Sequence, residues 1–283
     1  MKSLWLVYLT IREALFKGTL LFFFVVSNII ILFFLLALSS STENGITSVT
    51  ILGNQISPRG IPGFNPAEFI LLQLFNTATF WVLIFGIFAT AGLIPSMLEK
   101  GTIDLYLSKP LSRSQILIAR SAGACVGIGM NLLYFAVAIW LIVGIKTGVW
   151  HHQFLLASLM TLPIFFFYYS IVTLTGLITR STGFSIMFAL IFWAFTSAIG
   201  NREMLLYPWW DNVVYHRALD AAFYATPQIS LMIESAGRLI GNDIMTLANV
   251  PKPVFSILPF LYSALSAALL YSLSALYFSR RDY

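Results

Sequence analysis

Charged residues are scarce in this sequence. Of its 283 residues, 10% are Asp, Glu, Lys or Arg and 59% are hydrophobic, whereas about a quarter of an ordinary soluble domain is charged. This scarcity excludes a soluble globular domain and indicates an integral membrane protein. The net charge of +5 requires no nucleic-acid partner, because the anionic headgroups of membrane lipids explain it more simply.

Cysteine is nearly absent, since Cys125 is the single one in the chain. The chain therefore builds no disulfide and no thiolate metal site by itself, and in its apolar segment Cys125 acts as a small hydrophobe. His151 and His152 are adjacent, but the sequence has no carboxylate beside them, and two neighbouring histidines alone are a weak metal signal. We expect no metal and no cofactor in this chain.

Catalytic and coupling motifs are also missing. The sequence contains no H-E-x-x-H, G-x-S-x-G or G-x-x-x-x-G-K-[ST] motif, which mark metalloproteases, serine hydrolases and phosphate-binding loops. No ionisable residue lies deep in its long apolar runs, although ion-coupled transporters and intramembrane enzymes usually carry such residues within the bilayer. The chain is therefore predicted not to be an enzyme, and any uphill transport takes its energy from another polypeptide.

Long apolar runs are what the sequence does have. A helix needs ~20 residues to cross ~30 Å of hydrocarbon, and about six runs are long enough: 20–38, 69–94, 116–145, 154–179, 184–199 and 254–278. Strands of a β-barrel alternate apolar and polar residues, but the run at 20–38 is apolar on all sides. The prediction is an all-α polytopic membrane protein with one transmembrane domain over residues 1–283.

The N-terminal segment is expected to be an amphipathic helix in the membrane interface. Residues 1–17 lack the small-residue cleavage site of a signal peptide, and charges interrupt their apolar content. A helix of this kind lies flat with its apolar side towards the lipid. That side would hold Leu4, Tyr8, Ile11 and Leu15.

The distribution of Lys and Arg predicts the orientation. Short cytoplasmic loops retain these residues, and they are more numerous at the two termini and in 96–115 than in 39–67 and 201–253. We therefore place both termini and 96–115 in the cytosol, and 39–67 and 201–253 outside. Within the first external segment, ITSVTILGNQIS alternates in polarity around a Gly-Asn turn, which predicts a small hairpin.

Small residues mark one face of the third span. They recur at four-residue spacing, at Ala119, Gly123 and Gly127. In lipid such a face allows close helix contact, either within the chain or between two copies. Uncharged polar residues in or near the spans would line a path or bond neighbouring helices; they are Asn28, Gln73, Asn76 and Asn131.

A charged segment separates the second and third spans. Pro95 and Pro110 flank it, and each proline removes a backbone donor and disfavours helix at the residue before it. Ser112 and Gln115 have the S-x-x-Q spacing of a capping box, which predicts that a new helix begins at Arg113. One interpretation is a solvated loop with positive-inside charge; the other is a short rigid helix that docks a soluble partner.

Residues Glu99 to Leu117 read E-K-G-T-I-D-L-Y-L-S-K-P-L-S-R-S-Q-I-L. This run resembles the pattern G-T-[LI]-[DE]-L-x-L-[ST]-[KR]-P-[VL]-[ST]-R-x-x-[IL]-[LI], which marks permease subunits of bacterial ATP-binding cassette (ABC) transporters of the type-2 exporter class. The match is dense over about twenty residues, and chain length, span number and N-in topology agree with it. The pattern carries no information about the substrate.

The resemblance implies a six-helix subunit of the bacterial cytoplasmic (inner) membrane. Such subunits pair with a second copy or a close relative, and each rests on a separate ATPase, which holds ATP and Mg. Segment 97–113 would be the coupling helix that seats in the ATPase. The implied contact residues are Glu99, Gly101, Thr102, Asp104, Leu105, Leu107, Lys109, Pro110 and Arg113, with Arg180 of the next cytoplasmic loop as a second candidate contact.

Two other classes stay open at the level of the sequence. A secondary transporter or channel fits the spans but leaves the charged segment unexplained. A membrane-embedded enzyme acting on lipid needs a catalytic constellation, and His151, His152 and Asp211, in external loops, are too scattered to form one.

Overall fold

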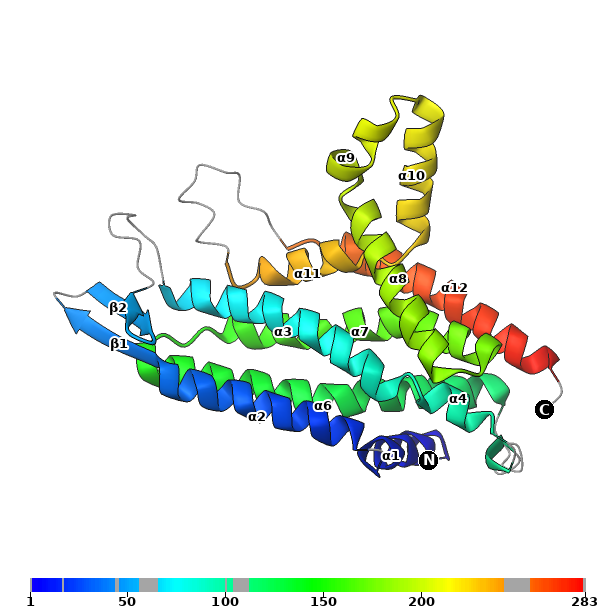
Figure 1. The fold of residues 1–283 in the computed structure, drawn as a ribbon, viewed down its shortest axis with the longest axis horizontal. Coiled ribbons are helices and arrows are strands. Elements are labelled where there is room, and N and C mark those ends of the chain that lie inside the picture. Colours follow the sequence, from blue (N-terminus) through cyan, green and yellow to red (C-terminus); the bar gives the residue numbers. More distant parts are fainter. Residues whose placement is uncertain are drawn as a thin grey trace.

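A computed structural model describes residues 2–16, 18–43, 46–55, 66–99, 101–103, 112–241 and 255–281. The described chain is all-α apart from a small sheet (Figure 1). It contains six helices that are long and apolar enough to cross a membrane, which confirms the predicted multi-span fold.

The helices of the spans are α2 (Thr19–Ala37), α3 (Pro66–Thr90) with its extension α4 (Leu93–Met97), α6 (Arg113–Thr147), α7 (His152–Thr179), α8 (Thr182–Gly200) and α12 (Leu258–Arg280). Each coincides with one predicted span. The largest difference is at the last, where the helix begins at Leu258 and not at residue 254. Pro259 lies in the first turn of α12, a position that tolerates a missing N–H donor.

The bundle has two distinct ends (Figure 1). Helices α2, α3, α6 and α7 run alongside one another, with a sheet at one end and both chain termini at the other. We call the end of the bundle that carries the sheet (38–43 and 46–55) the hairpin end, and the end that carries residues 2–16, 93–99, 101–103, 180–182 and 280–281 the termini end. The N-terminal helix α1 (Lys2–Phe16) lies at the termini end and packs along the start of α6.

The predicted hairpin is present. Strands β1 (Leu38–Glu43), β2 (Ile46–Ile51) and β3 (Asn54–Gln55) form an antiparallel sheet in that order. The turn between β2 and β3 consists of Leu52 and Gly53, both with positive φ (51° and 81°), and not of Gly53 and Asn54 as the sequence suggested. Two residues of positive φ make the tight turn that suits the twist of a hairpin.

The segment 201–253, which is predicted to be external, is largely helical in its described part. It holds α9 (Arg202–Leu205), the 3₁₀ turn η1 (Tyr207–Trp209), α10 (Val213–Ala225) and α11 (Ile229–Gly237). Helices α9 and α10 project from the bundle at the end of α8, while α11 returns to pack on α7 and α8 (Figure 1). The predicted loop at 201–253 is therefore an arm of short helices in its described part.

One polar cluster holds the arm together. Arg202 Nε donates to Asp220 Oδ1 at 2.6 Å, and the Tyr207 hydroxyl donates to the same oxygen at 2.8 Å. These hydrogen bonds, that of Arg202 first, lower the pKa of the Asp220 carboxyl. The guanidinium of Arg202 also lies 4.0 Å from the centre of the Phe223 ring, so that one arginine joins α9 to α10 through an ion pair and a cation–π contact.

The small-residue face of α6 packs within the chain. A Cβ added at Gly123 would lie 2.7 Å from Cβ of Thr10 in α1, and one at Gly127 would lie 3.2 Å from Leu20 of α2. Ala119 on the same face is buried. Of the two uses that the spacing left open, the structure shows packing of α6 against α1 and α2, which only small residues allow at such close approach.

Candidate functional site

The break at the termini end begins between α3 and α4. Regular helix stops at Thr90 and resumes at Leu93, with Ala91 and Gly92 as a turn. Pro95 explains the position, because its ring has no N–H to donate and clashes with the carbonyl four residues earlier, that of Ala91. Helix α4 is well packed, since Leu93, Ile94, Pro95 and Met97 are buried.

The chain forms a turn after α4. The N–H groups of Thr102 and Ile103 both donate to the carbonyl of Glu99 at 3.1 Å, and Gly101 has φ 85°, a conformation that favours glycine. The Glu99 side chain is exposed and Ile103 is buried. Of the candidate contact residues further along, Asp104, Leu105, Leu107, Lys109 and Pro110 lie outside the described residues.

The predicted helix start at Arg113 is confirmed. The hydroxyl of Ser112 accepts from Gln115 N at 3.2 Å, and Gln115 Oε1 accepts from Ser112 N at 3.1 Å, which is a complete capping box. Arg113 itself points to the end of α12, where its guanidinium donates to the carbonyls of Phe278 (2.7 Å) and Arg281 (2.6 Å). The structure thus gives this candidate contact residue a capping role within the chain.

The two predicted cytoplasmic contacts come together. Glu99, after α4, and Arg180, at the end of α7, line one pocket of about 460 Å³ together with Gly92, Ser96 and Thr182. Arg180 occupies the C-cap of α7 with φ 53°, and its side chain is exposed. Residues 81 positions apart in the sequence therefore present opposite charges at the mouth of a single hollow beside the helix break.

A buried ion pair lies behind this pocket. Arg120 of α6 is 0% exposed and donates to Glu13 Oε2 of α1 at 2.5 Å and to the carbonyl of Leu93 in α4 at 2.8 Å. Glu13 also accepts from the Ser96 hydroxyl at 2.8 Å. Helices α1, α4 and α6 are therefore joined by charge-assisted hydrogen bonds, which are stronger than neutral ones.

The sequence interpretation did not foresee this pair. Arg120 lies near the start of the predicted span 116–145, so it does not contradict the expectation that no ionisable residue lies deep in a span. Arg120 lies two turns into α6, but it is buried because α1 covers the first turns of that helix. The available signal was Glu13, the single carboxylate of the N-terminal helix, since a buried arginine requires such a partner.

A second pair lies at the hairpin end of the bundle. His151 Nε2, before α7, is 3.2 Å from Glu68 Oε1 in the first turn of α3, and the Glu68 side chain is buried. The histidine does have a carboxylate neighbour, which the sequence places 83 positions away. Within the described ranges no group of three or more His, Cys, Asp or Glu side chains is arranged to hold a metal ion.

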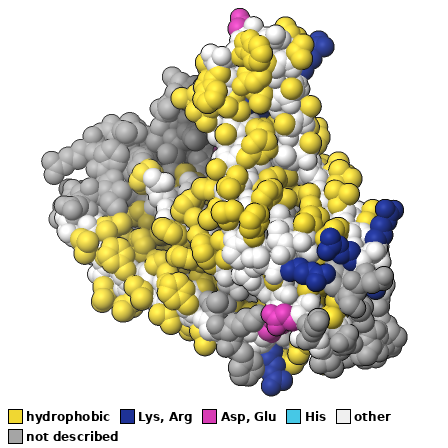
Figure 2. Space-filling view, turned by 45° about the vertical axis from the view of Figure 1, so that its right-hand side comes forward, with side chains coloured by type: hydrophobic (Ala, Val, Ile, Leu, Met, Phe, Trp, Pro, Cys, Tyr) yellow, Lys and Arg dark blue, Asp and Glu magenta, His cyan; other side chains and the backbone are white. Residues whose placement is uncertain are grey.

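The surface of the termini end is basic. Exposed arginines there are Arg12, Arg180, Arg280 and Arg281. Figure 2 shows Lys and Arg side chains gathered on the lower right, while hydrophobic side chains cover much of the remaining described surface. A basic end on an apolar body suits contact with anionic headgroups or with an acidic partner.

The chain is a multi-span helical membrane protein. A scan with protein-family models finds no match to it, and a search of curated proteins finds no similar sequence.

Proposed function

We propose that this chain is the permease subunit of an ATP-driven ABC transporter of the type-2 exporter class, with the termini end as the docking surface for the ATPase. The observation that carries the proposal is the pocket that Glu99 and Arg180 both line beside the break between α3 and α4. The resemblance of residues 99–117 to the permease pattern supports the same assignment.

The position of the pocket suits a lever, by which we mean an element that transmits movement of a bound partner to the transmembrane helices. A partner that pushes on residues 97–103 acts on α4, whose side chains are buried among α1, α6 and α7. Gly176 of α7 allows this contact, since a Cβ there would lie 3.4 Å from both Ile94 and Pro95. Because packed helices move as bodies and do not deform continuously, motion of α4 would tilt its neighbours.

The Glu13–Arg120 pair extends the lever to the first helix. It joins α1, α4 and α6 through contacts of 2.5 to 2.8 Å. A buried pair of this kind resists separation, because pulling one charge away leaves the other uncompensated in a low-dielectric site. The three helices would therefore respond to the ATPase as one unit.

In this role the chain has a defined orientation in the membrane and defined binding partners. The termini end would face the cytosol of a bacterium, in keeping with its exposed arginines, and the hairpin end would face outward. The chain would pair with a second copy or a homologous permease, and ATP and Mg would bind the ATPase. Transport is then the work of the assembly, and this subunit is not an enzyme.

The first test is purification of the tagged chain in mild detergent, with identification of bound proteins by mass spectrometry and an assay of ATP hydrolysis. We expect a stoichiometric ATPase with vanadate-sensitive turnover. A chain that purifies alone and hydrolyses no ATP contradicts the proposal and favours a channel or secondary transporter.

The second test reverses charge at the pocket. Glu99→Lys and Arg180→Glu should each weaken retention of the ATPase at least about tenfold, or ~1.4 kcal/mol, because a charged contact then becomes repulsive. Glu203→Lys, an exposed charge of the arm, is the matched control and should leave retention unchanged. If all three variants retain the ATPase equally, the pocket is not the docking surface.

A further inference from the structure

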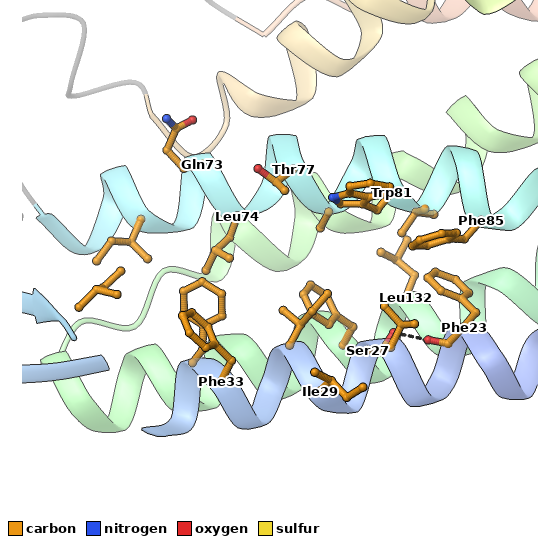
Figure 3. Close-up of a pocket in the computed structure, with 18 of the residues that line it drawn as sticks. Phe23, Ser27, Ile29, Phe33, Gln73, Leu74, Thr77, Trp81, Phe85 and Leu132 are labelled. Atoms are coloured by element: carbon orange, nitrogen blue, oxygen red, sulfur yellow. Dashed lines mark hydrogen bonds between the residues drawn. The ribbon is translucent and has the colours of Figure 1, made fainter. Parts of the chain in front are cut away.

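A long apolar groove runs between α2 and α3. Its volume is about 580 Å³, within the range of ligand sites in proteins, about 300–1,000 Å³. Its walls come from α2, α3 and α6, and in Figure 3 Phe33, Leu74 and Leu132 lie in the gap between the helices. The groove is distinct from the pocket at the termini end and shares no residue with it.

The groove has the length of one membrane leaflet. The rings of Phe22 and Phe23 contact Phe85 at centroid distances of 6.0 and 6.2 Å at its end nearest the termini, while Ile51 of β2 lines it at the hairpin end. Its lining on α2 extends from Phe23 to Phe34, which is about 16 Å of helix, or roughly half of a ~30 Å hydrocarbon core.

The walls of the groove offer few hydrogen-bonding groups to water. Sixteen of the nineteen lining residues are apolar, the exceptions being Ser27, Gln73 and Thr77. The Ser27 hydroxyl donates to the carbonyl of Phe23 in its own helix at 3.0 Å, and Gln73 points away from α2 (Figure 3). Buried water needs two to four polar partners, so hydrocarbon fills this space at lower free energy than water does.

The groove is continuous with the lipid-facing surface. Ile29 and Phe33 of α2 and Trp81 of α3 line it and are also exposed. At the hairpin end Lys146 of α6 donates to the carbonyls of Leu35 and Leu38, directly beyond the last lining residue of α2. A cation thus stands at the end of an apolar slot, the arrangement that complements a phosphate attached to a hydrocarbon chain.

We propose that this groove binds one acyl chain of a bilayer phospholipid, with the phosphate at the hairpin end near Lys146. The chain extends along α2 towards Phe23, and its terminal methyl lies near Phe85. Transfer of the acyl chain from bilayer to groove is nearly neutral, because lipid tails are as apolar as the groove walls. The preference of the acyl chain for this groove over other lipid-facing surface therefore comes from the shape of the groove and from the charge of Lys146.

Photolabelling tests the site directly. The purified chain is reconstituted in vesicles of phosphatidylethanolamine and phosphatidylglycerol with a trace of phosphatidylglycerol that carries a diazirine in the middle of one acyl chain. After irradiation, labelled peptides are mapped by mass spectrometry. We expect adducts on the groove residues of α2 and α3 to exceed, several-fold, those on Leu265 and Leu269 of α12, which are 66% and 65% exposed. Equal labelling of both surfaces overturns the proposal.

Filling the groove gives a second test. Ala78 lines it, and Ala78→Trp should abolish the excess labelling, whereas Leu269→Trp on α12 should not. Folding of each variant is judged by gel filtration and circular dichroism. If the tryptophan variant does not fold, the smaller change Ala78→Leu replaces it. We expect Ala78→Leu to reduce the excess of groove labelling over α12 labelling by half or more. Folded groove variants that label like the parent chain overturn the assignment.

A photoactivatable alkane without a headgroup tests the role of Lys146. It should label the groove several-fold less strongly than the phospholipid, and Lys146→Gln should remove that difference. Equal labelling by both probes in the parent chain refutes the phosphate contact. None of these measurements involves ATP, so their outcome is independent of the permease proposal.

Discussion

At the scale of single residues, buried charge is the main departure from the sequence interpretation. Arg120 and Glu13 form an ion pair 107 positions apart in the chain, and Glu68 Oε1 lies 3.2 Å from His151 Nε2. In both cases one partner lies near the end of a membrane span and the other reaches it from a different element. A hydropathy window does not reveal such residues, because one charge among many apolar residues barely changes the mean hydropathy of the window.

Removing one partner of the Glu13–Arg120 pair should destabilise the fold, although the intact pair adds little net stability. Arg120→Leu leaves Glu13 without its charged partner, and breaking a buried pair costs about 3–5 kcal/mol. We expect a clear fall in the midpoint of thermal unfolding in detergent, followed by circular dichroism. Replacing both residues, Glu13→Leu with Arg120→Leu, should recover part of the loss.

The matched control is the exposed pair of Arg238 and Glu234, four positions apart in the chain and 2.6 Å apart in space. Arg238→Leu should change stability by no more than about 0.5 kcal/mol, as exposed helix pairs do. The buried-pair interpretation fails if Arg120→Leu is as mild as Arg238→Leu.

At the scale of elements, helix α1 has two different faces. Leu6, Thr10 and Ala14 are buried against the bundle, while Tyr8 and Leu15 of the predicted apolar face are exposed. That face is therefore directed away from the protein, where an interfacial helix contacts lipid. Its position in the membrane interface stays a prediction.

Close packing of α1 on α6 depends on Gly123. We expect Gly123→Leu to displace α1, because the added Cβ alone would lie 2.7 Å from Thr10. In a Cys125→Ala background, a cysteine at Ala14, which is buried in the parent chain, should then react with a maleimide at least several-fold faster. Gly183→Leu is the control, since a Cβ at Gly183 meets no atom within 4 Å. An unchanged rate for Gly123→Leu contradicts the packing.

At the scale of the whole molecule, the two ends of the bundle differ in chemistry. The termini end carries exposed arginines and the pocket of Glu99 and Arg180, whereas the hairpin end carries the sheet and the Glu68–His151 pair. The basic end is the one that short-loop charge statistics place in the cytosol.

Orientation can be measured with a membrane-impermeant maleimide on bacterial spheroplasts. In the Cys125→Ala background, Leu52→Cys at the exposed β2–β3 turn should be labelled in intact cells, and Arg281→Cys after α12 only once the membrane is permeabilised. The reverse pattern refutes a cytosolic termini end and, with it, the proposed docking of an ATPase there.

The sequence by itself determined the six spans, the capping box at Ser112 and the hairpin after α2. These are local features, because a helix in hydrocarbon must satisfy its own backbone within one segment and a cap or tight turn involves neighbouring residues only. The resemblance named Glu99 and Arg180 as candidate contacts, but nothing in their spacing predicted that they line one pocket.

Only the tertiary structure decided which helix faces meet. It placed Arg120 against Glu13, Gly123 against Thr10, and left the groove between α2 and α3 open to the bilayer. In lipid, every span is apolar all round, so hydropathy does not distinguish the face that contacts a neighbour from the face that contacts a chain of lipid. Packing of small residues and a few buried polar contacts makes that choice, and both depend on residues far apart in the sequence.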